Sequence, residues 1–389
     1  MTHALAIFDE KPRLRALLDE FSIIKDPRDV RRVRHPLREI LLLNVCATIC
    51  GCDDYESIAA WGEAHLDVLR RWLPFEHGTP GGRWLTLLMN RINPALFSAA
   101  FTAWVRATWP DRPDLVAIDG KTSRHSHDRA EGKAPLHLVS AFATTSRLVL
   151  AQEAVGDKSN EITAIPELVA RLGEKDGLKG ALVTIDAIAT NATIAAAIRA
   201  AGADYLLAVK ANQPTLLADT GALFADLKPG PGDIDIDHDK GHGRVERREV
   251  TVAREVDWLS GERRFPGELR LPDVATVVRV RSRVETGGKT RGETRYYISS
   301  ARLDARRAGE AVRGHWAIEN NLHWELDVVF GEDQSRLRKG HGARNMAVLR
   351  HFAINLVRQG KDKRSLKLRR KIASWDPRYL AELLGATRR

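Results

Sequence analysis

Apolar residues in the first hundred positions recur every three or four residues, which is the spacing of one face of an α-helix. The clearest case begins near Pro36 and runs to Ile49, and Gly51 ends the pattern. Similar spacing predicts further helices over residues 55–61, 66–73 and 93–109. The chain is therefore expected to open with a helical region, residues 1–110.

From residue 115 the pattern changes to short apolar runs and to alternation, both of which are typical of β-strands. The expected order is strand, strand, strand, helix, strand, helix, strand over residues 115–119, 136–143, 148–155, 160–172, 181–186, 191–201 and 205–209. The first three strands form an antiparallel meander, and right-handed crossovers place the last two parallel to the first. This order predicts an α/β fold with a ribonuclease-H-like mixed sheet in residues 111–214.

A ribonuclease-H-like fold needs one more long helix packed on the sheet, and residues 304–329 are the candidate. The segment before this helix has strand patterns over residues 245–256, 274–284 and 294–299. We interpret residues 215–303 as a β-rich insertion and residues 304–357 as the completion of the core. Residues 358–389 then form a C-terminal tail.

The distribution of charge along the chain indicates a binding partner. The chain of 389 residues carries a formal net charge of +10, and the excess is C-terminal, since residues 333–389 hold 16 Lys and Arg against 4 Asp and Glu. Such a basic segment suits the phosphates of nucleic acids, although a solvated tail that aids solubility is the alternative. The candidate DNA-binding residues of this tail are Lys363, Arg364, Lys367, Arg369, Arg370 and Lys371.

The sequence argues against membrane and secreted proteins. No apolar run reaches the roughly 18 residues that span a bilayer, and acidic residues stand where a signal peptide would be apolar. Cys46, Cys50 and Cys52 lie in one short segment and are interpreted as small apolar residues of a buried helix, not as a disulfide framework or a zinc site. We expect a cytoplasmic, nucleoid-associated protein with no membrane partner and no nucleotide cofactor.

Three carboxylates are the candidates for chemistry. Asp119 and Asp186 each follow an apolar strand, at the edge of an open α/β sheet where ligands bind. Glu319 lies on the predicted last helix, with His315 and His323 four residues before and after it on one helical face. A single Asp at a strand end is more often a turn former or a helix cap, but two such ends in one sheet are more informative.

Carboxylates from two strands and a helix suit hard divalent cations, because Mg²⁺ takes oxygen ligands. Two such ions about 4 Å apart can activate the attacking oxygen and stabilise the leaving oxygen of a phosphodiester. We therefore expect two Mg²⁺ or Mn²⁺ ions in the site. A zinc site of His315, Glu319 and His323 is the weaker alternative, because the HExxH spacing is absent. Trp316 and Trp324 are interpreted as core residues, with base stacking as their alternative.

Several segments resemble the H-repeat-associated insertion-sequence transposases of the DDE superfamily. They are AIDGKT (117–122), LVTIDA (182–187), DYLLAVKANQ (204–213), GHGRVERR (241–248), RGHWAIENNLHWELDVVFGEDQSR (313–336) and the N-terminal residues 25–62. The resemblance spans most of the chain. It implies a DDE transposase with a ribonuclease-H-like core and with Asp119, Asp186 and Glu319 as its catalytic, metal-binding triad.

The resemblance also implies the reaction and the partners. The protein would cleave DNA at the ends of its element and transfer the freed strand into target DNA, with DNA bound as terminal repeats and as target. We expect a homodimer in the synaptic complex, with the N-terminal helical region binding the DNA ends. The rivals are a ribonuclease-H-like nuclease without transposition and an inactive copy that only binds DNA.

Further residues are candidates for positioning phosphate or DNA. Lys121 closely follows the first Asp, and Lys210 ends the fifth strand at the same edge of the sheet. His315 and His323 would position phosphate oxygens. The broader insertion-sequence transposases have an arginine shortly before the catalytic glutamate, and Arg313 would take its place here. Arg244 lies with His242 and Arg247 in the insertion, where contact with DNA is expected. For the lysines and the insertion residues, an ordinary solvated side chain is the alternative.

Overall fold

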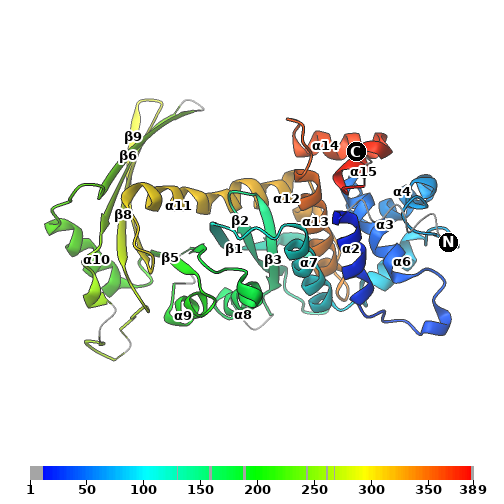
Figure 1. Cartoon of the computed structure of the whole chain (residues 1–389), viewed down its shortest axis with the longest axis horizontal. Helices are drawn as coiled ribbons and strands as arrows, with labels where there is room; N and C mark the ends of the chain where they lie inside the picture. Colours follow the sequence, from blue (N-terminus) through cyan, green and yellow to red (C-terminus); the bar gives the residue numbers. More distant parts are fainter. Residues whose placement is uncertain are drawn as a thin grey trace.

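The computed structural model describes residues 12–128, 130–156, 160–186, 190–241, 244–259, 262–266 and 268–386. The molecule is elongated, with helices from both ends of the chain at one extremity and the long hairpins of the insertion at the other (Figure 1). A single nine-stranded sheet connects the two, with the strand order β3-β2-β1-β4-β5-β9-β8-β7-β6. His242, expected to contact DNA, lies outside the described residues.

The N-terminal region is helical, as the apolar spacing predicts. Its elements are α2 (Pro12–Ile23), α3 (Leu37–Ile49), α4 (Tyr55–Ala64), α5 (Leu66–Leu69), α6 (Gly82–Met89) and α7 (Pro94–Thr108). Side chains cap two of them: Asp54 and Ser57 form a capping box on α4, and Asn93 accepts backbone hydrogen bonds at the start of α7. Helix α6 lies between the helices expected over residues 66–73 and 93–109 and was not itself predicted. The cysteines are free, and Cys46 and Cys50 are buried, in agreement with their apolar interpretation.

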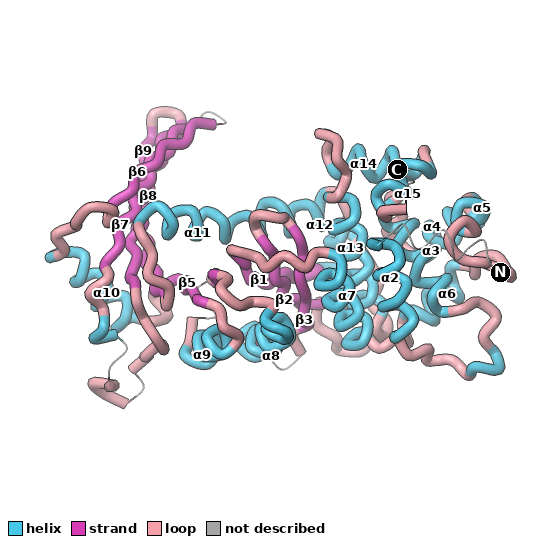
Figure 2. Tube along the Cα trace, in the orientation of Figure 1, coloured by secondary structure: helices cyan, strands magenta, loops and turns pink. Residues whose placement is uncertain are grey.

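The central five strands have the predicted ribonuclease-H-like topology. They are β1 (Leu115–Ser123), β2 (Leu136–Ala143), β3 (Leu148–Ala154), β4 (Leu182–Ile185) and β5 (Asp204–Val209). Strand β1 pairs antiparallel with β2 and parallel with β4, and β5 pairs parallel with β4. Helices α8 (Glu161–Gly173) and α9 (Ala192–Ala200) cover one face of these strands, while the long helix that follows the insertion crosses the other face (Figure 2).

The insertion extends the same sheet. Its strands are β6 (Ile234–Gly241), β7 (Arg244–Ala253), β8 (Thr276–Thr286) and β9 (Lys289–Ser299), preceded by α10 (Pro214–Asp226). Strand β9 pairs antiparallel with the core strand β5, so the insertion continues the sheet of the core. Three of the strands were expected, whereas β6 and α10 were not. Isoleucine alternates with aspartate only at the start of β6, and both Ile234 and Ile236 are exposed, so this strand buries no apolar face.

The predicted last helix is present, with an irregular centre. It runs as α11 (Ala305–Ala317), a π-helical segment (Ile318–His323) and α12 (Trp324–Val328). In the π-helical segment the amide of Trp324 bonds to the carbonyl of Glu319, five residues earlier. Gly314 lets this helix approach the sheet, because a Cβ there would lie 2.2 Å from Leu115 Cδ2. The helix and β1 are therefore held close together next to Glu319.

The basic C-terminal segment is a correction to the predicted tail. It folds as α14 (Leu366–Trp375) and α15 (Pro377–Leu383), which follow the buried helix α13 (Gly342–Arg358). Helices α13 and α14 both pack on α3, so the two ends of the chain share one hydrophobic core. Of the six predicted DNA-binding residues, Arg369 and Arg370 are buried, while the other four are exposed. No helix in the described residues is long and apolar enough to cross a membrane.

Candidate active site

Asp119 and Asp186 lie side by side, just beyond the point where the pairing of β1 with β4 ends. Asp186 follows the last residue of β4, whereas Asp119 lies within β1, which continues to Ser123 and is longer than the strand expected over residues 115–119. Ile118 of β1 is in register with Ile185 of β4, and each aspartate is the next residue along the chain. Alternation along the strands turns both aspartates toward the face that α11 covers, since Leu115 and Leu182 pack there with α11. The pairing that the sequence suggested therefore arises from the parallel register of β1 and β4.

Glu319 approaches the aspartates from the helix. Glu319, His315 and Asp186 line one cavity of about 460 Å³ between the core and the insertion strand β9, together with Lys210 and Trp316. Glu319 lies in the π-helical segment, where the turn of the helix is wider than in a regular α-helix. The structure thus brings all three predicted carboxylates to one edge of the sheet.

The pKa of Asp119 depends on the nearby carboxylates as well as on burial. Its pKa is raised to about 7; burial is the largest cause, and the negative charges of Glu161, Glu319 and Asp186 contribute to the same shift. The backbone amide of Gly120 donates to Asp119 Oδ1 at 2.8 Å and opposes the shift. Four acidic side chains therefore act on one another here, which stabilises a protonated Asp119 unless positive charge is supplied.

The two histidines contact different partners and do not form a zinc site with Glu319. His315 Nδ1 lies 3.0 Å from Thr184 Oγ1 on β4, whereas His323 Nδ1 lies 3.6 Å from Asp119 Oδ2. Burial lowers the pKa of both imidazoles, in the case of His323 to about 4. His315 and Glu319 line the same cavity, and His323 lies beside Asp119, so both histidines lie at the edge of the sheet where the carboxylates gather.

Lys210 is placed as predicted, at the end of β5. Its ammonium lies 2.8 Å and 3.0 Å from the two carboxylate oxygens of Asp186. Lys210 is exposed, so this ion pair can open without disturbing the core. The Lys210 ammonium therefore balances the negative charge of the Asp186 carboxylate.

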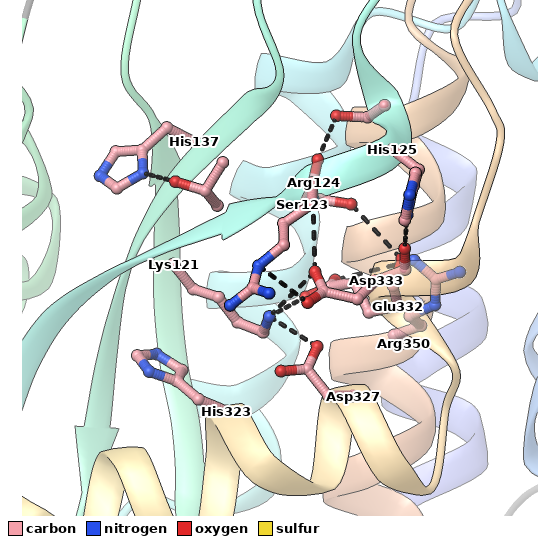
Figure 3. A network of polar contacts seen from close by, with 12 residues as sticks. Lys121, Ser123, Arg124, His125, His137, His323, Asp327, Glu332, Asp333 and Arg350 are labelled. Carbon is pink, nitrogen blue, oxygen red and sulfur yellow. Dashed lines mark hydrogen bonds and ion pairs between the residues drawn. The ribbon is translucent and has the colours of Figure 1, made fainter.

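Lys121 was expected to position phosphate, with a solvated side chain as the alternative, but its ammonium is paired with carboxylates of the protein. Figure 3 shows its ammonium enclosed by acidic residues that follow the π-helical segment, with Asp327 at 2.6 Å, Asp333 at 3.6 Å and Glu332 at 3.7 Å. The buried Arg350 lies 3.7 Å from Glu332 on the far side. The Lys121 side chain is only 10% exposed. Its charge is therefore balanced inside the protein, and it ties β1 to the end of the helix that carries Glu319.

The predicted arginines lie further out along α11. Arg313 forms an ion pair with Asp237 of β6, and Arg244 lies 3.7 Å from Glu246 within β7. Both arginines line a second cavity, of about 400 Å³, between α11 and the insertion. Arg313 therefore faces the insertion and not Asp119, Asp186 and Glu319. This differs from its expected place beside Glu319.

The tryptophans that flank Glu319 are not core residues. Trp316 is 38% exposed and Trp324 is 56% exposed, because the helix turns this side away from the sheet. Arg295 of β9 lies over the Trp316 ring, with its guanidinium carbon 5.0 Å from the ring centroid. The interpretation of both residues as core is therefore wrong for this structure.

Glu161 and His137 are two residues of the site that the sequence did not reveal. Glu161 is the first residue of α8, and its Oε1 lies 2.7 Å from His137 Nε2 on β2. An acidic residue in the first turn of a helix is common, because it complements the helix dipole, so the sequence alone gave no reason to select it. The signal that could have found it is the Gly120 that follows Asp119 and leaves room for a side chain there.

The donor set of this edge fits hard divalent cations. Asp119, Asp186, Glu319 and Glu161 offer carboxylate oxygens, which are the ligands that hard divalent cations take. Within the described ranges, no group of three or more His, Cys, Asp or Glu side chains is arranged to hold a metal ion. Cation binding would therefore require the carboxylates to draw together, with Lys210 leaving Asp186.

Sequence comparison identifies the class of protein. Residues 110–356 match the family model described as "Transposase DDE domain", and residues 18–105 match the model described as "DDE_Tnp_1-associated". The chain therefore belongs to the DDE transposase family. The match begins just before β1 and ends within α13, so it includes the three carboxylates and the insertion.

Its relatives include proteins named as H-repeat-associated. The chain is 39% identical over 380 residues to the "H repeat-associated putative transposase YhhI" of Escherichia coli (strain K12), which covers 96% of this chain and 99% of that protein. It is also 43% identical over 67 residues to the "Inactive transposase YbfQ" of the same organism, covering 17% of this chain and 80% of that protein. A solved structure, that of the piggyBac transposase synaptic complex with hairpin DNA, aligns with a TM-score of 0.40 and 10% identity, covering 99% of this chain and 81% of that one.

Proposed function

We propose that this protein is an active DDE transposase that uses divalent cations to cleave DNA at the ends of its element and to transfer the freed strand into target DNA. The observation that supports this most directly is the gathering of Asp119, Asp186 and Glu319 at one sheet edge, in a chain that belongs to the DDE family. Asp119, Asp186 and Glu319 would hold Mg²⁺ or Mn²⁺, with two ions in the site. When bound, these cations would supply the Lewis acidity that activates the attacking oxygen and stabilises the leaving oxygen.

The protein's own residues have separate tasks in this scheme. Water would attack the phosphodiester at the element end and release a 3′-hydroxyl, which would then attack a phosphodiester of the target and displace its 3′ oxygen. The neutral His323 would steady the Asp119 carboxylate, and His315 would be fixed by Thr184 at the cavity wall. Lys210, once separated from Asp186, is placed to meet a phosphate oxygen.

The experiment that tests the function uses the purified full chain with its own terminal repeats and a plasmid target. We expect end cleavage and strand transfer in Mg²⁺ or Mn²⁺, and neither product in the presence of a chelator. Cleavage without joined products would indicate the ribonuclease-H-like nuclease. Binding to the terminal repeats with no cleavage in either metal would indicate an inactive copy that only binds DNA.

DNA contact is proposed for the exposed cations of the C-terminal helices. We expect replacement of Lys363, Arg364, Lys367 and Lys371 with glutamine to weaken binding on all sequences, because phosphate contacts carry no base information. The slope of log affinity against log salt should become shallower by about 0.9 for each lost phosphate contact. Replacing the three lysines with arginine, which keeps the charge, should leave the slope unchanged. An unchanged slope in the glutamine variant would assign these residues to solubility alone.

His315 and His323 are expected to act through the carboxylates and the phosphate. Replacing either with alanine should slow cleavage by about 10- to 100-fold, the usual loss for a partner that orients a ligand. Thr184→Val should reproduce part of the His315→Ala effect, because it removes the hydroxyl beside His315 Nδ1. Single-turnover cleavage rates measure both effects.

The same two histidines decide between magnesium and zinc. Elemental analysis of protein purified without a metal-affinity tag is expected to find no stoichiometric zinc. Bound zinc that both substitutions remove would contradict the magnesium assignment.

The homodimer and the role of the N-terminal helices are also proposals. The associated N-terminal family model covers residues 18–105, which supports a function for this region together with the catalytic domain. We propose that it binds the DNA ends and that two copies of the chain assemble on paired ends. Light scattering of the protein with and without terminal-repeat DNA would measure this assembly.

A further inference from the structure

A chain of hydrogen bonds leads from β1 to the N-terminus of α8. Thr122 Oγ1 lies 2.7 Å from His137 Nδ1, and His137 Nε2 lies 2.7 Å from Glu161 Oε1. A carboxylate can only accept, so Nε2 carries the proton and donates to Glu161. In the neutral imidazole Nδ1 then accepts from the Thr122 hydroxyl, and the Glu161 carboxylate is held in one orientation.

The backbone beside Asp119 is shaped for this carboxylate. A Cβ at Gly120 would lie 2.0 Å from Glu161 Oε1 and 2.7 Å from His137 Nε2. Any other residue at position 120 would therefore displace both side chains. Glu161 therefore packs against the peptide that directly follows Asp119.

Histidines are the near neighbours of Asp119 and Glu161, which are half-buried, while Glu319 is exposed. In the described part of the chain, no Lys or Arg nitrogen lies within 4.0 Å of a carboxylate oxygen of Asp119, Glu161 or Glu319. Their near neighbours are the imidazoles of His137 and His323. Gathering like charges without compensation costs free energy, which a bound divalent cation would recover.

We propose that Glu161 is a fourth carboxylate of the cation-binding site, joining Asp119 from the N-terminus of α8, and that His137 and Thr122 are its positioning residues. The inference rests on the proposed function, because it assigns a residue to the same site. A purely structural role is the competing explanation, since Glu161 also complements the dipole at the start of α8. The two explanations differ in what a cation does to the protein.

The first measurement is Mn²⁺ binding to the full chain without DNA, by electron paramagnetic resonance and calorimetry. Glu161→Gln keeps the shape and an acceptor for His137 but removes the charge. We expect at least a tenfold weaker affinity for Mn²⁺, in the range of about 10- to 100-fold, and a smaller loss for His137→Ala. Glu167→Gln, an exposed residue of the same helix, is the matched control and should bind Mn²⁺ as the wild type does.

The second measurement separates a cation ligand from a structural residue. In chelator, Glu161→Gln should unfold at the same temperature as the wild type or higher, because a like charge has been removed. In Mn²⁺ the wild type should gain stability through binding, whereas Glu161→Gln should gain less. A residue that only supports α8 would lower the unfolding temperature equally in both buffers.

The outcomes distinguish this proposal from the proposed function. Wild-type affinity for Mn²⁺ in Glu161→Gln, or no Mn²⁺ binding by the wild type, would overturn the role of Glu161. Weakened Mn²⁺ binding in Glu161→Gln, together with a wild type that binds Mn²⁺ but cleaves no DNA, would instead retain Glu161 as a ligand and reject the transposase activity. Cleavage by the wild type together with unchanged cleavage and Mn²⁺ binding in Glu161→Gln would retain the transposase and reject the fourth carboxylate.

Discussion

Asp119→Asn, Asp186→Asn and Glu319→Gln are each expected to reduce end cleavage by more than about 1,000-fold, which corresponds to about 4 kcal/mol in the activation free energy. Each change removes one negative charge from the proposed cation site and keeps the size of the side chain. The loss should be nearly complete, because the three carboxylates act on the same cations and a partial set holds them poorly. Cleavage rates of a labelled terminal-repeat duplex in Mg²⁺ measure the effect.

Binding to DNA provides the control for these three variants. The substitutions lie at the sheet edge, and α14, which carries the exposed C-terminal cations, lies among the terminal helices (Figure 1). Affinity for the terminal repeats should therefore stay within about twofold of the wild type. A variant that retains more than a tenth of the wild-type rate would remove that residue from the catalytic set. A variant that loses binding and cleavage together would indicate misfolding, and its unfolding curve would show this.

Asp186→Asn should also weaken the contact between Asp186 and Lys210. Asp186 holds the exposed Lys210 ammonium at 2.8 Å, and the neutral asparagine holds it less strongly. Lys210→Gln is therefore expected to retain cation binding while slowing cleavage, since the lysine is proposed to meet phosphate only after it leaves Asp186. The two substitutions separate the residue that binds the cation from the residue that binds DNA.

The order of strands and helices could be predicted because it depends on local patterns. Apolar runs before Asp119 and Asp186 marked two buried strands, and the handedness of crossovers then fixed their parallel register. The π-helical segment could not be predicted in this way. Its five-residue hydrogen bond at Glu319 leaves the apolar positions nearly unchanged, so the sequence is compatible with a regular helix of the same length.

Lys121 and Arg370 are charged residues that were assigned to the wrong environment, and the partners of both lie far away in the sequence. Lys121 meets Asp327 and its neighbours, more than two hundred residues later, and Arg370 meets the end of α3. A lysine or an arginine is usually solvated, so a local pattern favours exposure unless the partner is known. The fold brings such partners together, and only the fold reveals which cations of the basic segment are free to bind DNA.

Arg370 shows how strongly the terminal helices depend on one such contact. Its guanidinium donates to the Thr48 carbonyl at 3.0 Å, to Asp53 Oδ1 at 2.7 Å and to the Val329 carbonyl, and it stacks on Phe330 with 4.0 Å between the guanidinium carbon and the ring centroid. Thr48 lies in the last turn of α3, and Val329 directly follows α12. One cation therefore compensates the C-terminal ends of two helices and joins both to α14.

Arg370→Met is expected to lower the free energy of unfolding by about 3 to 5 kcal/mol, because Asp53 and two carbonyl groups would remain without their partner. Burial already raises the pKa of Asp53 and the Arg370 charge opposes this, so removing the arginine would raise that pKa further. Urea denaturation followed by tryptophan fluorescence measures the change. Lys371→Met, at the exposed position next in the helix, should change stability by no more than about 0.5 kcal/mol. Equal effects of the two substitutions would contradict a buried role for Arg370 and return it to the set of cations available for DNA.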